Sequence, residues 1–190
     1  MQTLVLGLVI FLGVHSIAIF APAFRDRMVA RLGLVPWKIV YSIASLAGFL
    51  MIVGGYAAAR LEPVLLYNPP LWLRHVAALI MLPVFPLLLA AYLPGRIKTA
   101  VKHPMLAATK AWAVAHLLSN GMLADVLLFG GFLAWAVLDR ISVGKRPATA
   151  TVRPPGGWHN DVIAVVAGLL VYLVFVKWAH LRLIGIPPFG

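Results

Sequence analysis

The first 21 residues, MQTLVLGLVIFLGVHSIAIFA, decide the fold class of this chain. They form one apolar run, and a helix that crosses a bilayer needs roughly 20 apolar residues. Five further runs, one of them shorter, lie at Trp37–Ala59, Leu71–Tyr92, Pro104–Ser119, Gly121–Leu138 and Asp161–Ala179. Since 63% of all residues are hydrophobic, the sequence predicts an all-α, polytopic membrane helix bundle. We expect about six transmembrane helices in a single domain over residues 1–190.

The composition leaves little chemistry outside histidine and cofactors. The chain has no cysteine, which excludes disulfides, thiolate ligation of haem and iron–sulfur clusters. Its five acidic residues lie near loops or run ends, so no close carboxylate pair is expected for glycoside or two-metal chemistry. Any reaction must therefore use histidine or a cofactor with its own reactivity. Whether the protein is an enzyme stays open.

The net charge of +11 is distributed as in a membrane protein rather than a nucleic-acid-binding one. Eleven of the 16 Lys and Arg residues lie in or beside the loops after the first, third and fifth runs, and four lie on the opposite side. Positive residues favour the cytoplasmic side, so both termini are predicted outside. The bilayer is the expected partner, and the cytoplasmic face should attract anionic headgroups. No nucleic-acid partner is expected.

His15 is an ionisable residue about two-thirds of the way through the first run. On a helix it shares a face with Leu4, Leu8, Phe11, Leu12 and Ile19. An imidazole on such an apolar face needs a partner, because an unpaired buried polar group costs on the order of a few kcal/mol. One interpretation is a hydrogen bond to another helix. The other is metal ligation, since neutral imidazole is the commonest metal ligand.

His116 is the second histidine within a run. Trp112 precedes it by four residues and Asn120 follows it by four, so all three share one helix face. A flat aromatic side chain beside a histidine suits a macrocyclic cofactor, and it equally suits ordinary packing. Two histidines on different helices could hold a haem iron between them, which makes His15 and His116 the candidate ligands.

A basic cluster precedes the fourth run. Lys102 and His103 come directly before Pro104, which suits the first turn of a helix. With Arg96 and Lys98 close in sequence, this end could bind an anion such as a phosphate or a propionate. A solvated cytoplasmic surface is the alternative.

The pairing of the two histidines has an open alternative. At about 1.5 Å per residue, His15 lies roughly 10 Å and His116 roughly 18 Å above the cytoplasmic boundary. Axial ligands of one haem need similar depth, although helix tilt can absorb such a gap. His75 or His180 could pair with His116 instead, since both lie on the outer side.

Two segments together resemble the NnrU family. They are Lys102-His103-Pro104-Met105-Leu106 and Ala111-Trp112-Ala113-Val114-Ala115-His116-Leu117-Leu118-Ser119-Asn120-Gly121. The resemblance extends from the first helix, with its His15-Ser16, to the last. It implies a bacterial multi-pass protein of the inner membrane, with periplasmic termini by the charge pattern, associated with nitrite and nitric oxide reduction.

The related enzyme 15-cis-zeta-carotene isomerase carries a b-type haem with histidine ligation. The positions that match its ligands are His15 and His116, so the resemblance implies haem b at this pair. Trp112 would line the site, and Lys102 and His103 would pair with the propionates. The leading hypothesis is a haem-binding redox or sensing protein in nitrite and nitric oxide metabolism (denitrification), with reductase components as partners. A haem-dependent polyene isomerase and a non-catalytic assembly factor for a respiratory reductase are the alternatives.

Overall fold

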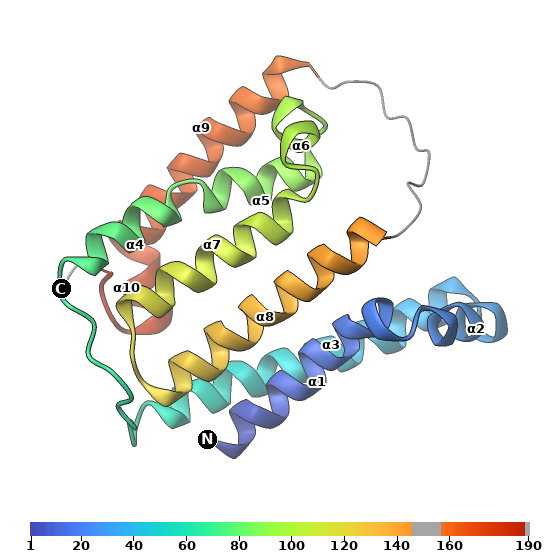
Figure 1. Cartoon of the computed structure of the whole chain (residues 1–190), viewed down its shortest axis with the longest axis horizontal. Coiled ribbons are helices and arrows are strands. Elements are labelled where there is room, and N and C mark those ends of the chain that lie inside the picture. The colour runs from blue at the N-terminus through green and yellow to red at the C-terminus, as the bar shows by residue number, and fades with distance from the viewer. Residues whose placement is uncertain (146–156, 189–190) are drawn as a thin grey trace. The chain divides into compact units, whose positions relative to one another are not determined.

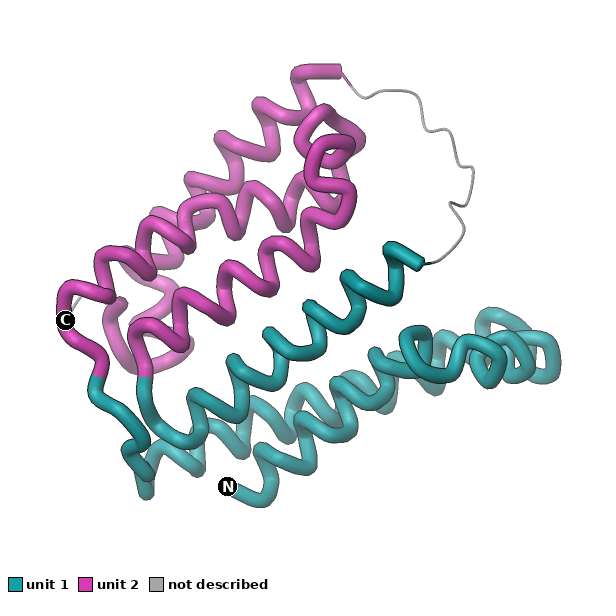
Figure 2. The backbone as a smooth tube through the Cα atoms, viewed as in Figure 1, with its two compact units in different colours: residues 1–68, 121–145 teal, residues 69–120, 146–190 magenta. Residues whose placement is uncertain are grey.

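The computed structural model describes residues 1–145 and 157–188. These residues are mostly helical and contain no β-strand, which confirms the predicted all-α class. The chain divides into two compact units, coloured separately in Figure 2. Unit 1 comprises residues 1–68 and 121–145, and unit 2 comprises residues 69–120 and 146–190. Two of the predicted cytoplasmic cations, Arg146 and Arg153, lie outside the described residues.

Among the described residues, five segments are long and apolar enough to cross a membrane. They are Gln2–Phe20, Leu34–Ala59, Leu73–Tyr92, Leu123–Lys145 and Trp158–Ile184. The helix over the fourth and shortest predicted run, Pro104–Ser119, has 16 residues. At about 1.5 Å per residue it is shorter than a hydrocarbon core of roughly 30 Å. These findings identify a multi-pass membrane protein, as the apolar runs predicted.

Unit 1 consists of four helices (Figure 1). They are α1 (Gln2–Phe20), α2 (Pro22–Leu32), α3 (Leu34–Ala59) and α8 (Leu123–Lys145). The sequence analysis missed the short α2, which has no buried residue and carries three arginines. Pro22 begins this helix at a position where its missing N–H is not needed.

Glycines bring α1 and α3 close together in unit 1. A Cβ atom on Gly7 would lie 2.7 Å from the backbone nitrogen of Ile52, and one on Gly48 would lie 2.8 Å from that of Phe11. A Cβ on Gly55 would overlap the backbone of Leu4, whose own side chain is fully buried. Small residues permit such approach between membrane helices, so these glycines set the spacing of the pair.

A buried acid joins α3 to α8. Asp125 is 3% exposed, and its Oδ1 accepts a hydrogen bond of 2.6 Å from the Tyr56 hydroxyl. Its Oδ2 accepts one of 3.0 Å from the backbone N–H of Met122, just before α8 begins. Burial, reinforced by the negative charge of Asp125, raises the pKa of Tyr67 in the neighbouring loop. Asp125 thus satisfies one donor at the start of α8 and one on α3.

Unit 2 contains the remaining helices. They are α4 (Leu73–Met81), α5 (Val84–Tyr92), α6 (Arg96–Val101), α7 (Pro104–Ser119), α9 (Trp158–Val174), the π-helix η1 (Phe175–Ala179) and α10 (His180–Ile184). The third apolar run is broken between α4 and α5 at Leu82 and Pro83. The break follows from proline, which lacks a backbone donor and disrupts the preceding helical turn.

Three specific contacts link α9 to other helices of unit 2. Gly168 of α9 lies so close to Pro86 of α5 that a Cβ atom would overlap the proline. The Tyr172 hydroxyl donates to the Ala78 carbonyl at 3.1 Å, which ties α9 to α4. Asp161 accepts hydrogen bonds of 3.0 Å from the backbone N–H groups of residues 96 and 97. The start of α6 is therefore capped by a carboxylate from α9.

Candidate functional site

The ring of His15 has a defined tautomer. Its Nδ1 lies 2.7 Å from the carbonyl oxygen of Phe11, one turn earlier on α1. A carbonyl only accepts hydrogen bonds, so Nδ1 carries the proton and donates. In the neutral ring the lone pair is then on Nε2. A ring N–H that donates to a backbone carbonyl is the usual way in which a metal-ligating histidine is oriented.

Aromatic side chains from all three spans of unit 1 surround His15. The ring of Phe11 stacks on the imidazole with centroids 4.2 Å apart. Tyr41 of α3 lies at 5.3 Å, and Trp135 of α8 meets the imidazole edge-on at 6.0 Å. His15 is half-buried, so it lies at a junction of three helices rather than on a lipid-facing surface.

One buried polar atom at this junction, the Nε1 of Trp135, has no hydrogen-bond partner. Ser45 lies one helical turn after Tyr41 on α3, and its side chain interacts with that of Tyr41. Buried donors normally find a partner in protein or water, and each exception needs an explanation. A polar ligand group beside His15 would provide one.

His116 in unit 2 has the same local arrangement as His15. Its Nδ1 lies 2.8 Å from the carbonyl oxygen of Trp112, and the two rings are 5.3 Å apart. The proton is again on Nδ1, and the lone pair of the neutral ring is on Nε2. Asn120, which follows α7 in an extended conformation, donates through its side-chain amide to the His116 carbonyl at 3.0 Å. The pairing of His116 with His15 stays a prediction.

Lys102 and His103 form an unusual turn between α6 and α7. Lys102 has a φ of 64° and is the one residue other than glycine with a positive φ among the described residues. The N–H of His103 donates to the Val101 carbonyl at 2.7 Å, which makes Lys102 the centre of a strained γ-turn. Pro104 begins α7, as predicted. Strain of this kind concentrates at functional positions, and the sequence carried no signal for it.

Some backbone donors close to the predicted anion site already have a partner within the protein. The backbone donors at the start of α6 already bind the carboxylate of Asp161. Lys102 is exposed and His103 is half-buried. Their expected role with propionates stays a prediction.

Three other histidines lie near helix ends, as His116 does in the last turn of α7. His180 begins α10, and its Nδ1 lies 2.6 Å from the Ile186 carbonyl. His159 stacks on Trp158 at 4.0 Å, at the start of α9. His75 lies in the first turn of α4. No three His, Asp or Glu side chains within residues 1–145 and 157–188 form a group that could hold a metal ion.

Sequence reasoning missed most of the surroundings of His15. Tyr41 and Ser45 are spaced by four residues, a pattern that indicates one shared helix face. Trp135 comes from a helix more than a hundred residues away in the chain, and no local pattern connects it to His15. The contact arises only because α1 packs against both α3 and α8.

These features define a multi-pass α-helical membrane protein with two half-buried, oriented histidines on separate helices. The chain belongs to the NnrU protein family, whose family model matches residues 3–188 and so covers both units. No curated protein and no solved structure shows a significant match to the chain.

Proposed function

We propose that this protein binds a b-type haem through His15 and His116 and serves nitrite and nitric oxide metabolism in the bacterial inner membrane. Membership of the NnrU family supports a role linked to the expression or assembly of nitrite or nitric oxide reductase. Both termini lie in the periplasm in this proposal, with the basic loops in the cytoplasm.

The observation that carries the proposal is that the two histidines make the same hydrogen bond and have the same tautomer. In each ring Nδ1 donates to the carbonyl four residues earlier, and Nε2 is the nitrogen with the lone pair. This is the arrangement that orients an axial ligand and increases its basicity. Haem, when bound, supplies an iron centre suited to electron transfer or gated ligand exchange.

Neighbouring residues fit such a group. Phe11, Tyr41 and Trp135 supply flat apolar surface around His15, and the unpaired indole N–H of Trp135 offers a donor to a polar ligand atom. Trp112 supplies the same kind of surface beside His116. Lys102 and His103 are proposed to pair with the carboxylates.

The test is the visible spectrum of the full-length protein, purified in detergent and recorded oxidised and reduced. We expect a low-spin spectrum with a Soret peak and sharp reduced α and β bands. His15→Ala and His116→Ala should each abolish it without preventing membrane insertion, because each would remove one of the two residues proposed to hold the haem. His159→Ala is the matched control, since that histidine stacks on a tryptophan near a helix end.

Other outcomes of this test are equally informative. Loss of the spectrum in His180→Ala or His75→Ala, with His15→Ala unchanged, would replace His15 by that residue. A full spectrum in both His15→Ala and His116→Ala would refute the assignment. No chromophore, even when haem is supplied during expression, would favour a non-catalytic assembly factor. A haem-bound protein that converts a polyene lipid between isomers would favour the isomerase alternative.

A further inference from the structure

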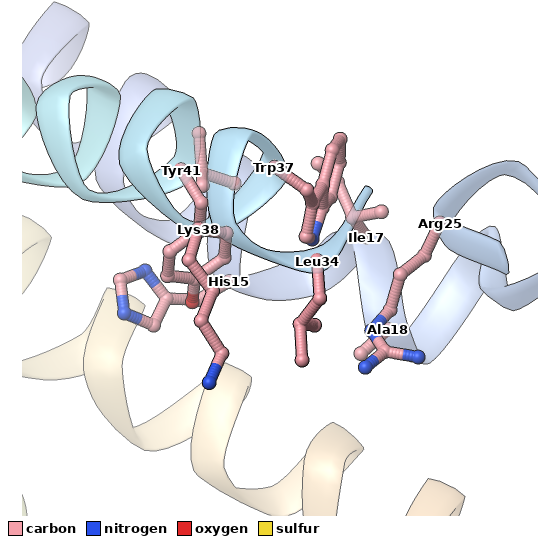
Figure 3. Close-up of a pocket in the computed structure, with 9 residues that line it drawn as sticks. His15, Ile17, Ala18, Arg25, Leu34, Trp37, Lys38 and Tyr41 are labelled. Carbon is pink, nitrogen blue, oxygen red and sulfur yellow. The ribbon is translucent and has the colours of Figure 1, made fainter. Parts of the chain in front are cut away.

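A pocket of about 240 Å³ opens between α1, α2 and α3 in unit 1. Figure 3 shows the side chains that line it, and the set combines apolar, aromatic and basic groups. Val14, Ile17, Ala18 and Leu34 are its apolar residues, Trp37 and Tyr41 are aromatic, and His15, Arg25 and Lys38 are basic. The pocket therefore combines two positively charged side chains, those of Arg25 and Lys38, with a mainly apolar lining.

The charged ends of Arg25 and Lys38 point to the same side of the pocket in Figure 3, with Leu34 between them. Arg25 forms an ion pair of 3.0 Å with Asp26, and both of these side chains are largely exposed. An exposed pair of this kind contributes little. It also engages one nitrogen of a guanidinium that has five donors, so Arg25 can still bind a second anion.

One more acid lies on the neighbouring helix. Asp139 of α8 interacts electrostatically with Tyr41. It is not among the residues that line the pocket. Within residues 22–38 the chain has four basic residues and one acidic residue, so this corner of unit 1 remains positively charged.

The position of the pocket fits a membrane surface. Helix α2 lies between two spans and has no buried residue. Phe24 and Leu32 of α2 are exposed beside its arginines. Trp37, at the start of the second span, packs edge-on against Phe24 at 6.2 Å. Exposed apolar side chains, a tryptophan and cations together are typical of an interfacial helix.

We infer that this pocket binds the phosphate headgroup of an anionic phospholipid. The guanidinium of Arg25 suits a phosphate because it presents paired donors, and Lys38 adds a flexible point charge. Leu34 lines the pocket and is itself 48% exposed, which gives the start of an acyl chain an apolar contact. The lipid site does not rest on the proposed binding of haem, although His15, a proposed haem ligand, is also among the residues that line the pocket.

The test is native mass spectrometry of the full-length protein titrated with phosphatidylglycerol or with phosphatidylcholine of the same acyl chains. Wild type should bind phosphatidylglycerol in preference. The double variant R25Q/K38Q should bind it at least about tenfold more weakly, since each basic residue near an anionic lipid contributes roughly fivefold. R27Q/R31Q is the matched control, because it removes the same charge from exposed residues that do not line the pocket.

The alternatives give different results. Equal weakening in R25Q/K38Q and R27Q/R31Q would show a general charge effect and overturn the site. Displacement of the lipid by inorganic phosphate would show that the pocket selects phosphate without the lipid body, and would overturn the lipid assignment. Lost haem absorbance in R25Q/K38Q with unchanged lipid binding would assign the cations to a cofactor carboxylate. Should the double variant not fold, Lys38→Gln alone should still weaken binding by about fivefold.

Discussion

Unit 1 and unit 2 each place a glycine of one helix against the backbone of another, but they use their tethering aspartate in different ways. In unit 1, Asp125 is buried and joins two spans through a tyrosine hydroxyl and a backbone N–H. In unit 2, Asp161 is half-buried and caps a short helix through two backbone N–H groups. A carboxylate buried in a span must be fully hydrogen-bonded, whereas one at a boundary keeps access to water.

The largest expected effect concerns the close contacts between a glycine and a neighbouring helix, which occur in both units. Gly55→Ala should destabilise the protein by about 3 kcal/mol, because the new Cβ overlaps the backbone of Leu4 and the helices must separate. Gly54→Ala should have little effect, since nothing lies within 4 Å of its added Cβ. Unfolding of both variants in mixed detergent micelles, followed by circular dichroism, measures the difference. Equal stability of the two variants would refute the close approach of α1 and α3.

The second largest effect is expected for Asp125, the buried acid of unit 1. Asp125→Ala should cost about 2 kcal/mol, because the Tyr56 hydroxyl and the Met122 N–H both lose their acceptor. A double-mutant cycle with Tyr56→Phe checks the reason. If the hydrogen bond carries the effect, Tyr56→Phe should cost far less in the Asp125→Ala background than in wild type. Additive costs would show that the two side chains act independently.

The boundary acid of unit 2 should matter less. Asp161→Ala removes a helix cap and should cost about 1 kcal/mol, because water can reach the freed N–H groups of α6. The same micelle unfolding assay applies, with Asp26→Ala as the control for an exposed acid that pairs only with Arg25. A cost for Asp161→Ala as large as that of Asp125→Ala would remove the distinction between the two units.

The membrane spans could be predicted from the sequence because the length of an apolar run is enough to identify them. The run Met1–Ala21 became Gln2–Phe20, and Pro104–Ser119 was found with the same ends. Gly121–Leu138 was too short, since α8 continues past Arg140 to Lys145. A long basic side chain can keep its charge in water while its stem lies along a helix, so the charged residues there did not end the helix.

The candidate histidines were also found from sequence, because an imidazole in an apolar run is conspicuous. Their hydrogen bonds and aromatic neighbours were not, since Trp135 reaches His15 only through tertiary packing. Asp125 was expected near a span end, and nothing in the sequence indicated that Tyr56 would bind it. Contacts between distant segments depend on how helices rotate against each other, which residue spacing alone does not determine.

The smallest expected effect is a pH dependence of stability that arises from Tyr67, in the loop that follows α3 in unit 1. Burial, aided by the charge of Asp125, raises the pKa of Tyr67, so the folded protein keeps this phenol neutral where the unfolded chain ionises it. The stability that this provides is present below the unfolded pKa of about 10 and is lost as pH rises above it. Wild type should therefore lose stability more steeply than Tyr67→Phe above about pH 10 in the micelle assay. Tyr92→Phe, at a side chain that is 74% exposed, is the control. Parallel curves for wild type and Tyr67→Phe would show that neither burial nor the charge of Asp125 raises the pKa of Tyr67 in the folded protein.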